Sequence, residues 1–577
     1  MKPPHGTVAE ALVDTLIAAG IPRVYGIPGD SLNAVTEAMR TRPNLRWVPV
    51  RHEEAAAFAC SAEAHLTGRL AVCAGSCGPG NLHLINGLYD AHRSRVPVLA
   101  IAAQIPTPEI GTGYFQETRP EALFRECSHY CETIAHPTQL YPVLDAAMRS
   151  ALTLRGVAVV VLPGDVAWRP APEGRPSPPP EGGPALALPS DAVLTRLAAL
   201  LNTASKVTIL AGAGCAGAQP QLIALGTRLQ APIVHTMRGK EFVEPENPLD
   251  VGMTGLLGFS SGYHAMMDSD LLLMLGTDFP YRPFYPTEAT IVQVDLRGEQ
   301  IGRRVPVDLG VVGDVRATLD AVLSRITAKP DDGHLRASLA HYAGARRELD
   351  GLAVGGVGER PIHPQWVARA IDDLAAPDAI FSCDVGEPTV WTARYVRMNG
   401  RRRLVGSFIH GSMAGALPLA IGAQSSHPGR SVIALAGDGG LAMMMGELLT
   451  LAQLELPVKV VVFNNGTLGF VELEMKAAGL VPFATELTNP DFAALANTIG
   501  LFGRRAETAD QVRPMLAEAF AHPGPALVDV VVRRPELVMP PSITWHELSG
   551  FSLYLMKAVL NGDASEVIDL ARTALFR

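Results

Sequence analysis

Short, nearly continuous apolar runs alternate with amphipathic windows along the whole chain. Apolar runs of this length, rich in β-branched residues and separated by helical patterns, are typical of parallel strands that helices cover on both faces. The pattern predicts strands at 69–74, 96–102 and 157–162, at 206–210, 271–275 and 290–294, and at 431–436, 458–463 and 526–532. We therefore predict an α/β fold of three doubly wound parallel-sheet domains followed by a short C-terminal tail.

Breaks in this pattern divide the chain, whose 577 residues are too many for a single hydrophobic core. Residues 169–189 are rich in proline and can pack little, and polar helix-breaking stretches follow at 329–333 and 351–363. The predicted domains are 1–182, 183–335 and 336–535, and the predicted tail is 536–577.

Composition argues against several classes of protein. The formal net charge of −9 is unfavourable for nucleic-acid binding, which needs a basic surface. Seven cysteines in a chain of this length form no disulfide framework, and they predict buried thiols in a reducing compartment. The N-terminus carries no signal-peptide pattern, and glycines interrupt the long uncharged stretch at 70–89. We therefore predict a cytoplasmic protein without a membrane-spanning helix.

The strongest local signal is a pair of polar motifs at the ends of two predicted strands. Gly437-Asp438-Gly439-Gly440 follows one strand and Asn464-Asn465 follows the next, with 24 residues between Gly439 and Asn464. A strand, a helix predicted at 441–454 and a return strand bring both motifs to one edge of a sheet, where ligands bind. A carboxylate and an amide oxygen suit Mg²⁺ on a diphosphate, and glycines let the backbone approach phosphates. Gly-Asp-Gly alone would fit an acid that caps a helix equally well.

The two motifs at this spacing resemble the fingerprint of enzymes that use thiamine diphosphate (ThDP). Segments at 111–117, 406–413 and 550–554 are similar to the bacterial quinone-dependent pyruvate dehydrogenases, flavoproteins also called pyruvate oxidases. These enzymes belong to a ThDP- and FAD-dependent family that includes acetolactate synthase. The resemblance extends from about Thr7 to Arg577 and implies ThDP, Mg²⁺ and FAD as cofactors.

The resemblance assigns roles to residues of the first and third predicted domains. Glu53 matches the glutamate beside the aminopyrimidine ring, where a carboxyl favours the imino tautomer that takes the C2 proton of the thiazolium. Met413 matches the residue that holds ThDP bent, and Phe115, Gln116 and Phe470 match positions over the reactive carbon. ThDP contacts are implied for Gly411, Ser412, Met413, Asp438, Gly439, Gly440, Asn465, Gly466, Thr467, Leu468 and Gly469, and Mg²⁺ contacts for Asp438, Asn465 and the Thr467 carbonyl. Without the third-domain motifs, Glu53 would be better explained as a first-turn acid of a helix.

The resemblance also implies a quaternary structure. In this family the pyrimidine-binding domain of one subunit faces the diphosphate-binding domain of another. Glu53 and Asp438 lie in different predicted domains, so we expect a dimer at least, and a homotetramer of paired dimers.

The middle domain carries the glycine pattern Gly212-x-Gly214-x-x-Gly217 after a predicted strand. No acidic residue follows the next apolar run at 232–235, so a nicotinamide dinucleotide site is not predicted. The domain instead resembles the flavin domain of the pyruvate oxidases, which favours FAD over the alternative of a vestigial domain without a cofactor. FAD contacts are implied for Gly252, Met253, Thr254, Gly255, Gly276, Thr277, Asp278, Phe279 and Asp295.

The C-terminal residues 563–577 are amphipathic, with an apolar stripe at helical spacing. The pattern alone favours a helix docked on the body of the protein. The resemblance instead implies a tail that binds membrane lipid reversibly when substrate reduces the flavin. On that hypothesis the protein associates peripherally with the inner face of the cell membrane.

These interpretations together predict oxidative decarboxylation of pyruvate to acetate and CO₂, with electrons passed through FAD to a membrane quinone. Three alternatives stay open: carboligation of the acetolactate synthase type, a phosphate- and oxygen-dependent pyruvate oxidase, and a ThDP-binding scaffold at the membrane without activity. The sequence leaves the 2-oxo acid and the electron acceptor open.

Overall fold

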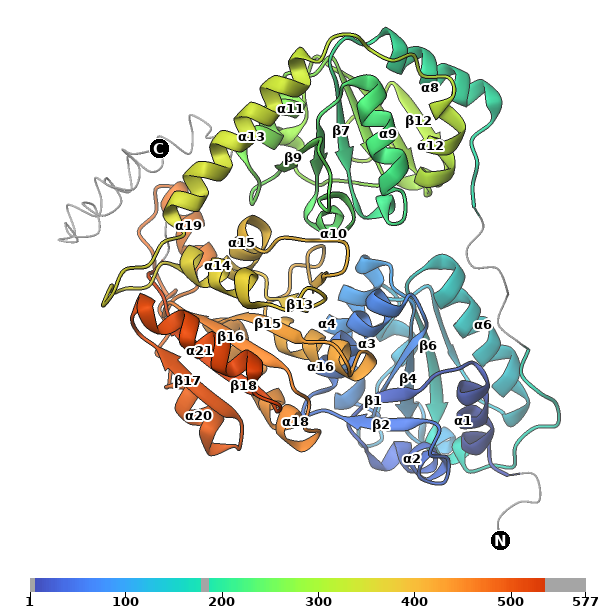
Figure 1. The fold of residues 1–577 in the computed structure, drawn as a ribbon. Helices are drawn as coiled ribbons and strands as arrows, with labels where there is room; N and C mark the ends of the chain where they lie inside the picture. The colour runs from blue at the N-terminus through green and yellow to red at the C-terminus, as the bar shows by residue number, and fades with distance from the viewer. Residues whose placement is uncertain (1–5, 178–185, 535–577) are drawn as a thin grey trace.

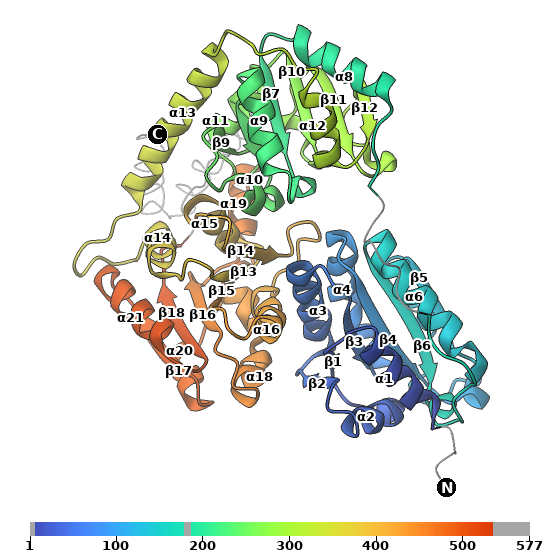
Figure 2. The same ribbon diagram turned by 45° about the vertical axis from the view of Figure 1, so that its right-hand side comes forward.

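A computed structural model describes residues 6–177 and 186–534, which form three α/β domains, each built on a six-stranded parallel sheet (Figures 1 and 2). The predicted fold class is confirmed for these residues, and the predicted tail lies outside them. Within these two ranges, no helix has the length and apolar character needed to cross a bilayer.

The first domain has the strand order β2-β1-β3-β4-β6-β5. Its middle strands are fully buried because helices cover both faces of the sheet, which explains their continuous apolar sequence. Its strands are β1 (Arg23–Gly26), β2 (Arg46–Pro49), β3 (Ala71–Gly75), β4 (Val98–Gln104), β5 (Tyr130–Thr133) and β6 (Val157–Pro163), and its helices are α1 (Val8–Ala18), α2 (Asn33–Arg40), α3 (Glu53–Thr67), α4 (Pro79–Ser94), α5 (Pro120–Leu123), α6 (Leu140–Leu154) and α7 (Gly164–Ala167).

The middle domain has the strand order β12-β11-β10-β7-β8-β9, which is the arrangement of dinucleotide-binding sheets. Successive strands are added toward one edge of the sheet from β7 to β9 and toward the other edge from β10 to β12. The strand order therefore changes direction between β7 and β10, and ligands bind at such switch points. Its strands are β7 (Val207–Ala211), β8 (Ile233–His235), β9 (Asp250–Met253), β10 (Leu271–Leu275), β11 (Thr290–Asp295) and β12 (Leu309–Val312), and its helices are α8 (Asp191–Thr203), α9 (Gln219–Leu229), α10 (Lys240–Val243), α11 (Ser260–Met267) and α12 (Val315–Leu323).

The third domain repeats the topology of the first, with the order β14-β13-β15-β16-β18-β17 and a switch point between β13 and β15. The long helix α13 (Gly333–Leu352) packs on α11 and β9 and leads into this domain (Figure 1). Its strands are β13 (Ile380–Cys383), β14 (Arg403–Gly406), β15 (Val432–Gly437), β16 (Lys459–Asn464), β17 (Phe502–Ala506) and β18 (Ala526–Val531), and its helices are α14 (Pro364–Leu374), α15 (Glu387–Tyr395), α16 (Ala416–Ser426), α17 (Asp438–Met443), α18 (Leu448–Gln453), α19 (Gly469–Ala477), α20 (Phe492–Thr498) and α21 (Ala509–Ala521).

The first and third domains share one apolar core, in which α16 packs directly on α3. The contact is close because Gly422 presents its backbone to α3: a Cβ there would lie 2.0 Å from the carbonyl oxygen of Ala59. The backbone N–H groups of Arg51 and His52 both donate to Glu447 Oε1 at 2.9 Å, which ties the start of α3 to the third domain.

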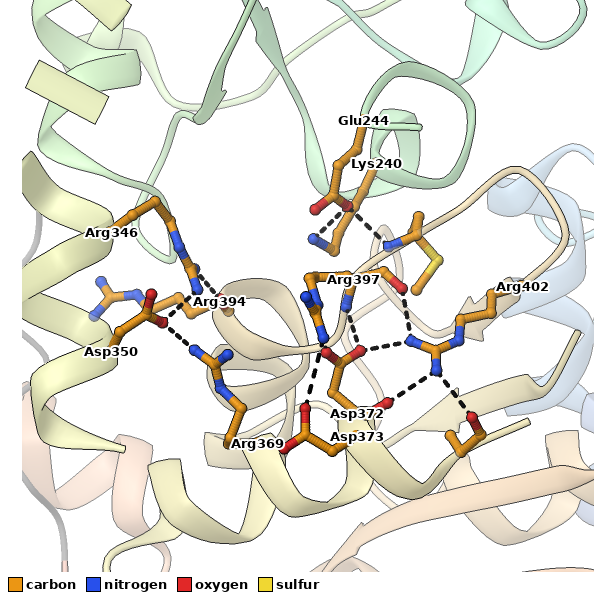
Figure 3. A network of polar contacts seen from close by, with 12 residues as sticks. Lys240, Glu244, Arg346, Asp350, Arg369, Asp372, Asp373, Arg394, Arg397 and Arg402 are labelled. Carbon is orange, nitrogen blue, oxygen red and sulfur yellow. Dashed lines mark hydrogen bonds and ion pairs between the residues drawn. The ribbon is translucent and has the colours of Figure 1, made fainter. Parts of the chain in front are cut away.

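The middle domain meets the third through both apolar and polar contacts. Met253 and Phe259 share an apolar cluster with Ala393 of α15, and Figure 3 shows part of the polar network nearby. On the third-domain side, buried Asp372 binds Arg402 and Arg397. The α15 residue Arg394 donates to the carbonyl oxygens of Leu257 and Gly258, at 3.2 and 3.1 Å. Other labelled contacts of this network join Lys240 to Glu244, Arg346 and Arg369 to Asp350, Arg346 to the carbonyl oxygen of Arg394, and Arg397 to Asp373.

One buried carboxylate joins all three domains. Glu241 of α10 lies 3.1 Å from His65 Nε2 of α3 and accepts a hydrogen bond from Arg403 Nε of β14 at 2.8 Å. Burial opposes ionisation of Glu241, but the hydrogen bonds and charges of His65 and Arg403 prevail and lower its pKa to about 2. The carboxylate is therefore charged at neutral pH and bridges the domains electrostatically.

Candidate functional site

The two polar motifs of the third domain lie together at the carboxyl edge of its sheet. Asp438 begins α17 directly after β15, and its side chain is buried. Its Oδ2 accepts hydrogen bonds from the Gly466 N–H and from the Asn489 side chain, both at 2.7 Å. Its Oδ1 accepts one from the Gly439 N–H at 2.9 Å. Asp438 thus links the first motif to the loop that follows Asn465.

The second motif presents an amide oxygen beside this carboxylate. Asn465 donates its side-chain N–H to Glu387 Oε2 at 3.0 Å, and its Oδ1 accepts from the Thr467 N–H at 3.0 Å. The amide oxygen keeps a second lone pair for a further contact. A Cβ on Gly469 would lie 2.4 Å from Glu387 Oε1, so a larger residue there would displace the Glu387 side chain from Asn465.

The donor set fits Mg²⁺. Burial raises the pKa of Asp438 despite its hydrogen bonds, so a cation here would help keep the carboxylate charged. In residues 6–177 and 186–534, no group of three His, Cys, Asp or Glu side chains is placed to hold a metal. A hard ion bound by one carboxylate and one amide oxygen completes its shell with phosphate, water or backbone oxygens, as Mg²⁺ commonly does.

The switch point of the third sheet explains Gly440 of the first motif. A Cβ on Gly440 would lie 2.2 Å from Oδ2 of Asp384, the residue after β13. Burial raises the pKa of Asp384 to about 7, although it accepts hydrogen bonds from the Ala416 and Gly437 N–H groups. Asp384 therefore holds the neighbouring loops of the site together.

An apolar wall stands beside the predicted diphosphate loop. A Cβ on Gly439 would lie 3.2 Å from Leu468 and from Leu487 and 3.3 Å from the methyl carbon of Met413. Ser412 donates its N–H to Ser407 Oγ at 3.1 Å, and its hydroxyl accepts from Asn86 Nδ2 of α4 at 2.9 Å. Gly411 has a φ of +83°, a conformation in which most side chains are strained. The structure thus gathers residues 411–413, 438–440 and 465–469 around one edge of the sheet.

The predicted acid lies in the first domain. Glu53 begins α3, is buried, and its Oε2 lies 2.9 Å from His83 Nδ1 of α4. A Cβ on Gly80 would lie 3.0 Å from Glu53 Oε1, so the 76–81 turn passes close to the carboxylate. His83 stacks on His52, with ring centroids 4.3 Å apart.

The predicted pocket residues are divided between two places. Gln116 packs on the same turn as Glu53: its Oε1 lies 3.4 Å from Cys77 Sγ, and a Cβ on Gly78 would meet its side chain at 2.9 Å. Phe115 beside it is 77% exposed. Phe470 is the second residue of α19 in the third domain, and it lines the cleft described below. The structure contains one chain, so the pairing of Glu53 with Asp438 across subunits stays a prediction.

In the middle domain, the glycine pattern lies at the switch point between β7 and β10. A Cβ on Gly214 would lie 2.6 Å from the Cα of Gly276, and one on Gly212 would lie 2.6 Å from the Gly276 carbonyl oxygen. Gly276 also has a φ of +56°. The glycines therefore allow the two loops at the switch point to pack backbone against backbone.

A cleft of about 1500 Å³ opens at this switch point and extends to the third domain. Most of the predicted flavin contacts line it, and so do two residues of the predicted ThDP side. Its lining includes Met253, Thr254, Gly276, Thr277, Asp278, Phe279 and Asp295 of the middle domain and Gly411 and Phe470 of the third. Gly252 packs instead against Phe259 and Tyr342, and Gly255 packs against the ring of Phe279.

Charges at one end of the cleft suit a dinucleotide. Arg95 and Arg155 of the first domain and Arg297 of the middle domain line the wall, and Arg95 lies 3.4 Å from Asp278. Burial, followed by the charge of Arg95, lowers the pKa of Arg297. Burial also raises the pKa of Asp295. Crowded cations beside a glycine-lined crevice fit the diphosphate of FAD, and the volume of the cleft is large enough for a ligand of that size.

Several residues of the site carried no signal in the sequence. Glu387, Asn489 and Asp384 hold the loops of the predicted metal site, at 437–440 and 465–469, by direct hydrogen bonds. Each lies tens of residues from the motif that it supports, so no local spacing could have indicated it. Glu472 is nearer, five residues after Thr467 on α19, and it accepts a hydrogen bond from the Thr467 hydroxyl at 2.9 Å.

Comparison with known proteins agrees with this architecture. Models of the thiamine pyrophosphate enzymes match the N-terminal TPP binding domain at residues 6–123, the central domain at 194–322 and the C-terminal TPP binding domain at 384–530. Thiamine pyrophosphate is another name for ThDP.

Full-length relatives extend the match. The chain is 36% identical to the Bacillus subtilis protein YdaP, over 99% of both chains. It is 32% identical to a pyruvate oxidase of Lactiplantibacillus plantarum, over 90% of this chain and 88% of that one. It is also 32% identical to an acetolactate synthase large subunit of Parasynechococcus marenigrum, over 92% of this chain and 88% of that one. The chain therefore belongs to the thiamine pyrophosphate enzyme family, and its first and third domains are ThDP-binding domains.

Proposed function

We propose that this protein oxidatively decarboxylates pyruvate to acetate and CO₂, with ThDP, Mg²⁺ and FAD as cofactors and a membrane quinone as electron acceptor. The observation that carries the proposal is the cleft that runs from the predicted flavin residues to Gly411 and Phe470. A flavin in that cleft would lie against the wall of the ThDP domain, where electrons from a decarboxylated 2-oxo acid become available. The pyruvate oxidase among the relatives supports pyruvate as the substrate.

The residues of this chain would bind the cofactors, orient them and exclude water from the site. Asp438, Asn465 and the Thr467 carbonyl would hold Mg²⁺, and Met413 would support the coenzyme from the wall beside Gly439. When bound, ThDP supplies the electron sink for decarboxylation and FAD the two-electron acceptor. Glu53 would hold a proton at the aminopyrimidine ring, in a place where burial excludes water.

The assembly and location belong to the same proposal. Exposed apolar side chains cluster in loops near both halves of the site, among them Tyr114, Phe115, Leu480 and Phe483. Contact with a second subunit would cover such side chains, which supports a dimer at least and a homotetramer of paired dimers. We place the protein in the cytoplasm, peripherally on the inner face of the cell membrane, with the tail at 536–577 as the lipid-binding element.

The test is anaerobic absorbance of the purified protein with ThDP and Mg²⁺. Added pyruvate should bleach the oxidised flavin band, and added quinone should restore it with acetate as the product. An oxidised flavin spectrum that stays unchanged while acetolactate accumulates would favour carboligation, as in the acetolactate synthase relative. A requirement for phosphate and oxygen, with acetyl phosphate as product, would favour the other kind of pyruvate oxidase.

A further inference from the structure

Helix α19 has two faces with different surroundings. Phe470, Leu473, Glu474 and Ala477 follow helical spacing and line the cleft. Glu472 and Lys476, one turn apart on another face, are both buried. The helix therefore separates the cleft from a buried ion pair, and the pair has no place in the function proposed above.

The ion pair contacts the metal loop, which is the segment at 465–469 predicted to bind Mg²⁺. Lys476 Nζ lies 2.6 Å from Glu472 Oε1, and the other oxygen, Oε2, accepts the Thr467 hydroxyl at 2.9 Å. The Thr467 hydroxyl also lies 3.1 Å from the carbonyl oxygen of Thr485. Residues on either side of Thr467 bond to the same opposing segment: the Leu468 N–H donates to Thr485 at 2.8 Å, and the Gly466 carbonyl accepts from Leu487 at 2.9 Å.

These contacts restrict the orientation of Thr467. A buried carboxylate needs a counter-charge and hydrogen-bond donors, and Lys476 and the Thr467 hydroxyl supply them. Because Glu472 lies on a regular helix and the hydroxyl is anchored to it, the peptide of Thr467 is held relative to α19. The carbonyl of that peptide is the one predicted to face Mg²⁺.

We infer that Glu472 and Lys476 are positioning residues that hold the metal loop in register with α19 and so couple Mg²⁺ binding to the position of the cleft wall. The inference rests on the metal site of the proposed function. Groups that orient metal ligands without touching the metal commonly change its affinity by about 10- to 100-fold when they are removed.

The experiment compares Thr467→Val with Thr467→Ser. Valine keeps the backbone carbonyl and the shape but removes the hydroxyl, whereas serine retains the hydroxyl that reaches Glu472. Mg²⁺ affinity is measured by calorimetric titration of the protein at a saturating ThDP concentration. We expect Thr467→Val to bind Mg²⁺ about 10-fold or more weakly, and Thr467→Ser to match the wild type.

Lys476→Met tests the other end of the arrangement. It should weaken Mg²⁺ binding in the same direction and raise KM for the 2-oxo acid with kcat retained at saturating Mg²⁺, because the wall is displaced while the reacting groups remain. The matched control is Lys240→Met, which removes the buried lysine of another ion pair, 2.7 Å from the partly buried Glu244 that follows α10. Its effect on stability should be similar, and Mg²⁺ affinity should not change.

The outcomes separate two claims, the metal site itself and the positioning role of Glu472 and Lys476. Wild-type protein that binds neither Mg²⁺ nor ThDP would refute the metal site itself. Wild-type binding together with unchanged Mg²⁺ affinity in Thr467→Val would refute the positioning role alone, as would equal losses in Thr467→Ser and Thr467→Val. If Lys476→Met does not fold, the serine and valine pair still decides, because both variants keep the buried ion pair.

Discussion

The packing of α16 on α3 predicts that Gly422→Ala destabilises the protein, although alanine is the better helix former. In an isolated helix interior this substitution would stabilise by about 1 kcal/mol. Here the new Cβ would lie 2.0 Å from the Ala59 carbonyl oxygen and 2.7 Å from its carbonyl carbon. Both contacts are with backbone, so no side chain can move aside.

The magnitude follows from the required displacement. Carbon–oxygen contacts normally lie at roughly 3.3 Å or more, so the two helices must separate by about 1 Å. Overpacking of a closely packed interface costs about 1–3 kcal/mol, and a clash between backbones falls at the upper end. After the gain in helix propensity is subtracted, a net loss of about 2 kcal/mol is expected. For domains of this size that corresponds to a Tm lower by roughly 4–8 °C.

The assay is thermal unfolding monitored by circular dichroism. The control is Gly351→Ala near the end of α13, where no heavy atom lies within 4 Å of the new Cβ. The control should unfold at or slightly above the wild-type temperature. A Gly422→Ala protein that unfolds at the same temperature as the control would show that the helices separate without cost, and the reasoning from backbone contact would be wrong.

Three further predictions concern the charged groups. Glu241→Gln should destabilise the protein by about 3 kcal/mol at pH 7, because it leaves His65 and Arg403 without their buried anion. The folded pKa of Glu241 is about 2, below its unfolded value, so its stabilisation is present above roughly pH 4.3 and is lost as the pH falls toward 2. Urea unfolding should show this loss of stability for the wild type and not for the variant. Identical pH profiles of the two proteins would contradict the prediction. Asp438→Asn should weaken Mg²⁺-dependent ThDP binding about 100-fold or more in a fluorescence titration, and retained affinity would remove Asp438 from the metal site. Glu53→Gln should lower pyruvate turnover by about 10²- to 10⁴-fold with ThDP affinity retained, and a loss of binding instead of turnover would assign Glu53 a structural role.

The pattern of apolar positions predicted the strands that are buried on both faces of their sheets. All nine predicted strands are present, with ends displaced by at most two residues. The strands without a clear pattern lie mostly at sheet edges, such as β12, where buried and exposed residues alternate, and β17, which carries Arg504 and Arg505. Edge strands need apolar residues on fewer sides, so their sequences carry less signal.

Tertiary contacts account for the remaining differences. The helix predicted at 441–454 is interrupted at Met445–Glu447, where the Glu447 side chain turns to bind the backbone of Arg51 and His52. In the site, the Gly-Asp-Gly and Asn-Asn motifs were predictable because each directly follows a buried strand. Asn489 and Glu387 were not, because only folding brings them to Asp438 and Asn465.

The cleft has an implication for the lifetime of the protein. Side chains of all three domains line it, so a ligand bound there adds its own free energy to the assembled arrangement. At a free concentration one hundred times its dissociation constant, that increment is about 2.7 kcal/mol. Protein made while the ligand is scarce lacks this increment, its middle domain opens more often, and proteases reach it sooner. Cofactor supply would in this way set the amount of enzyme a cell retains, as well as the fraction that is active.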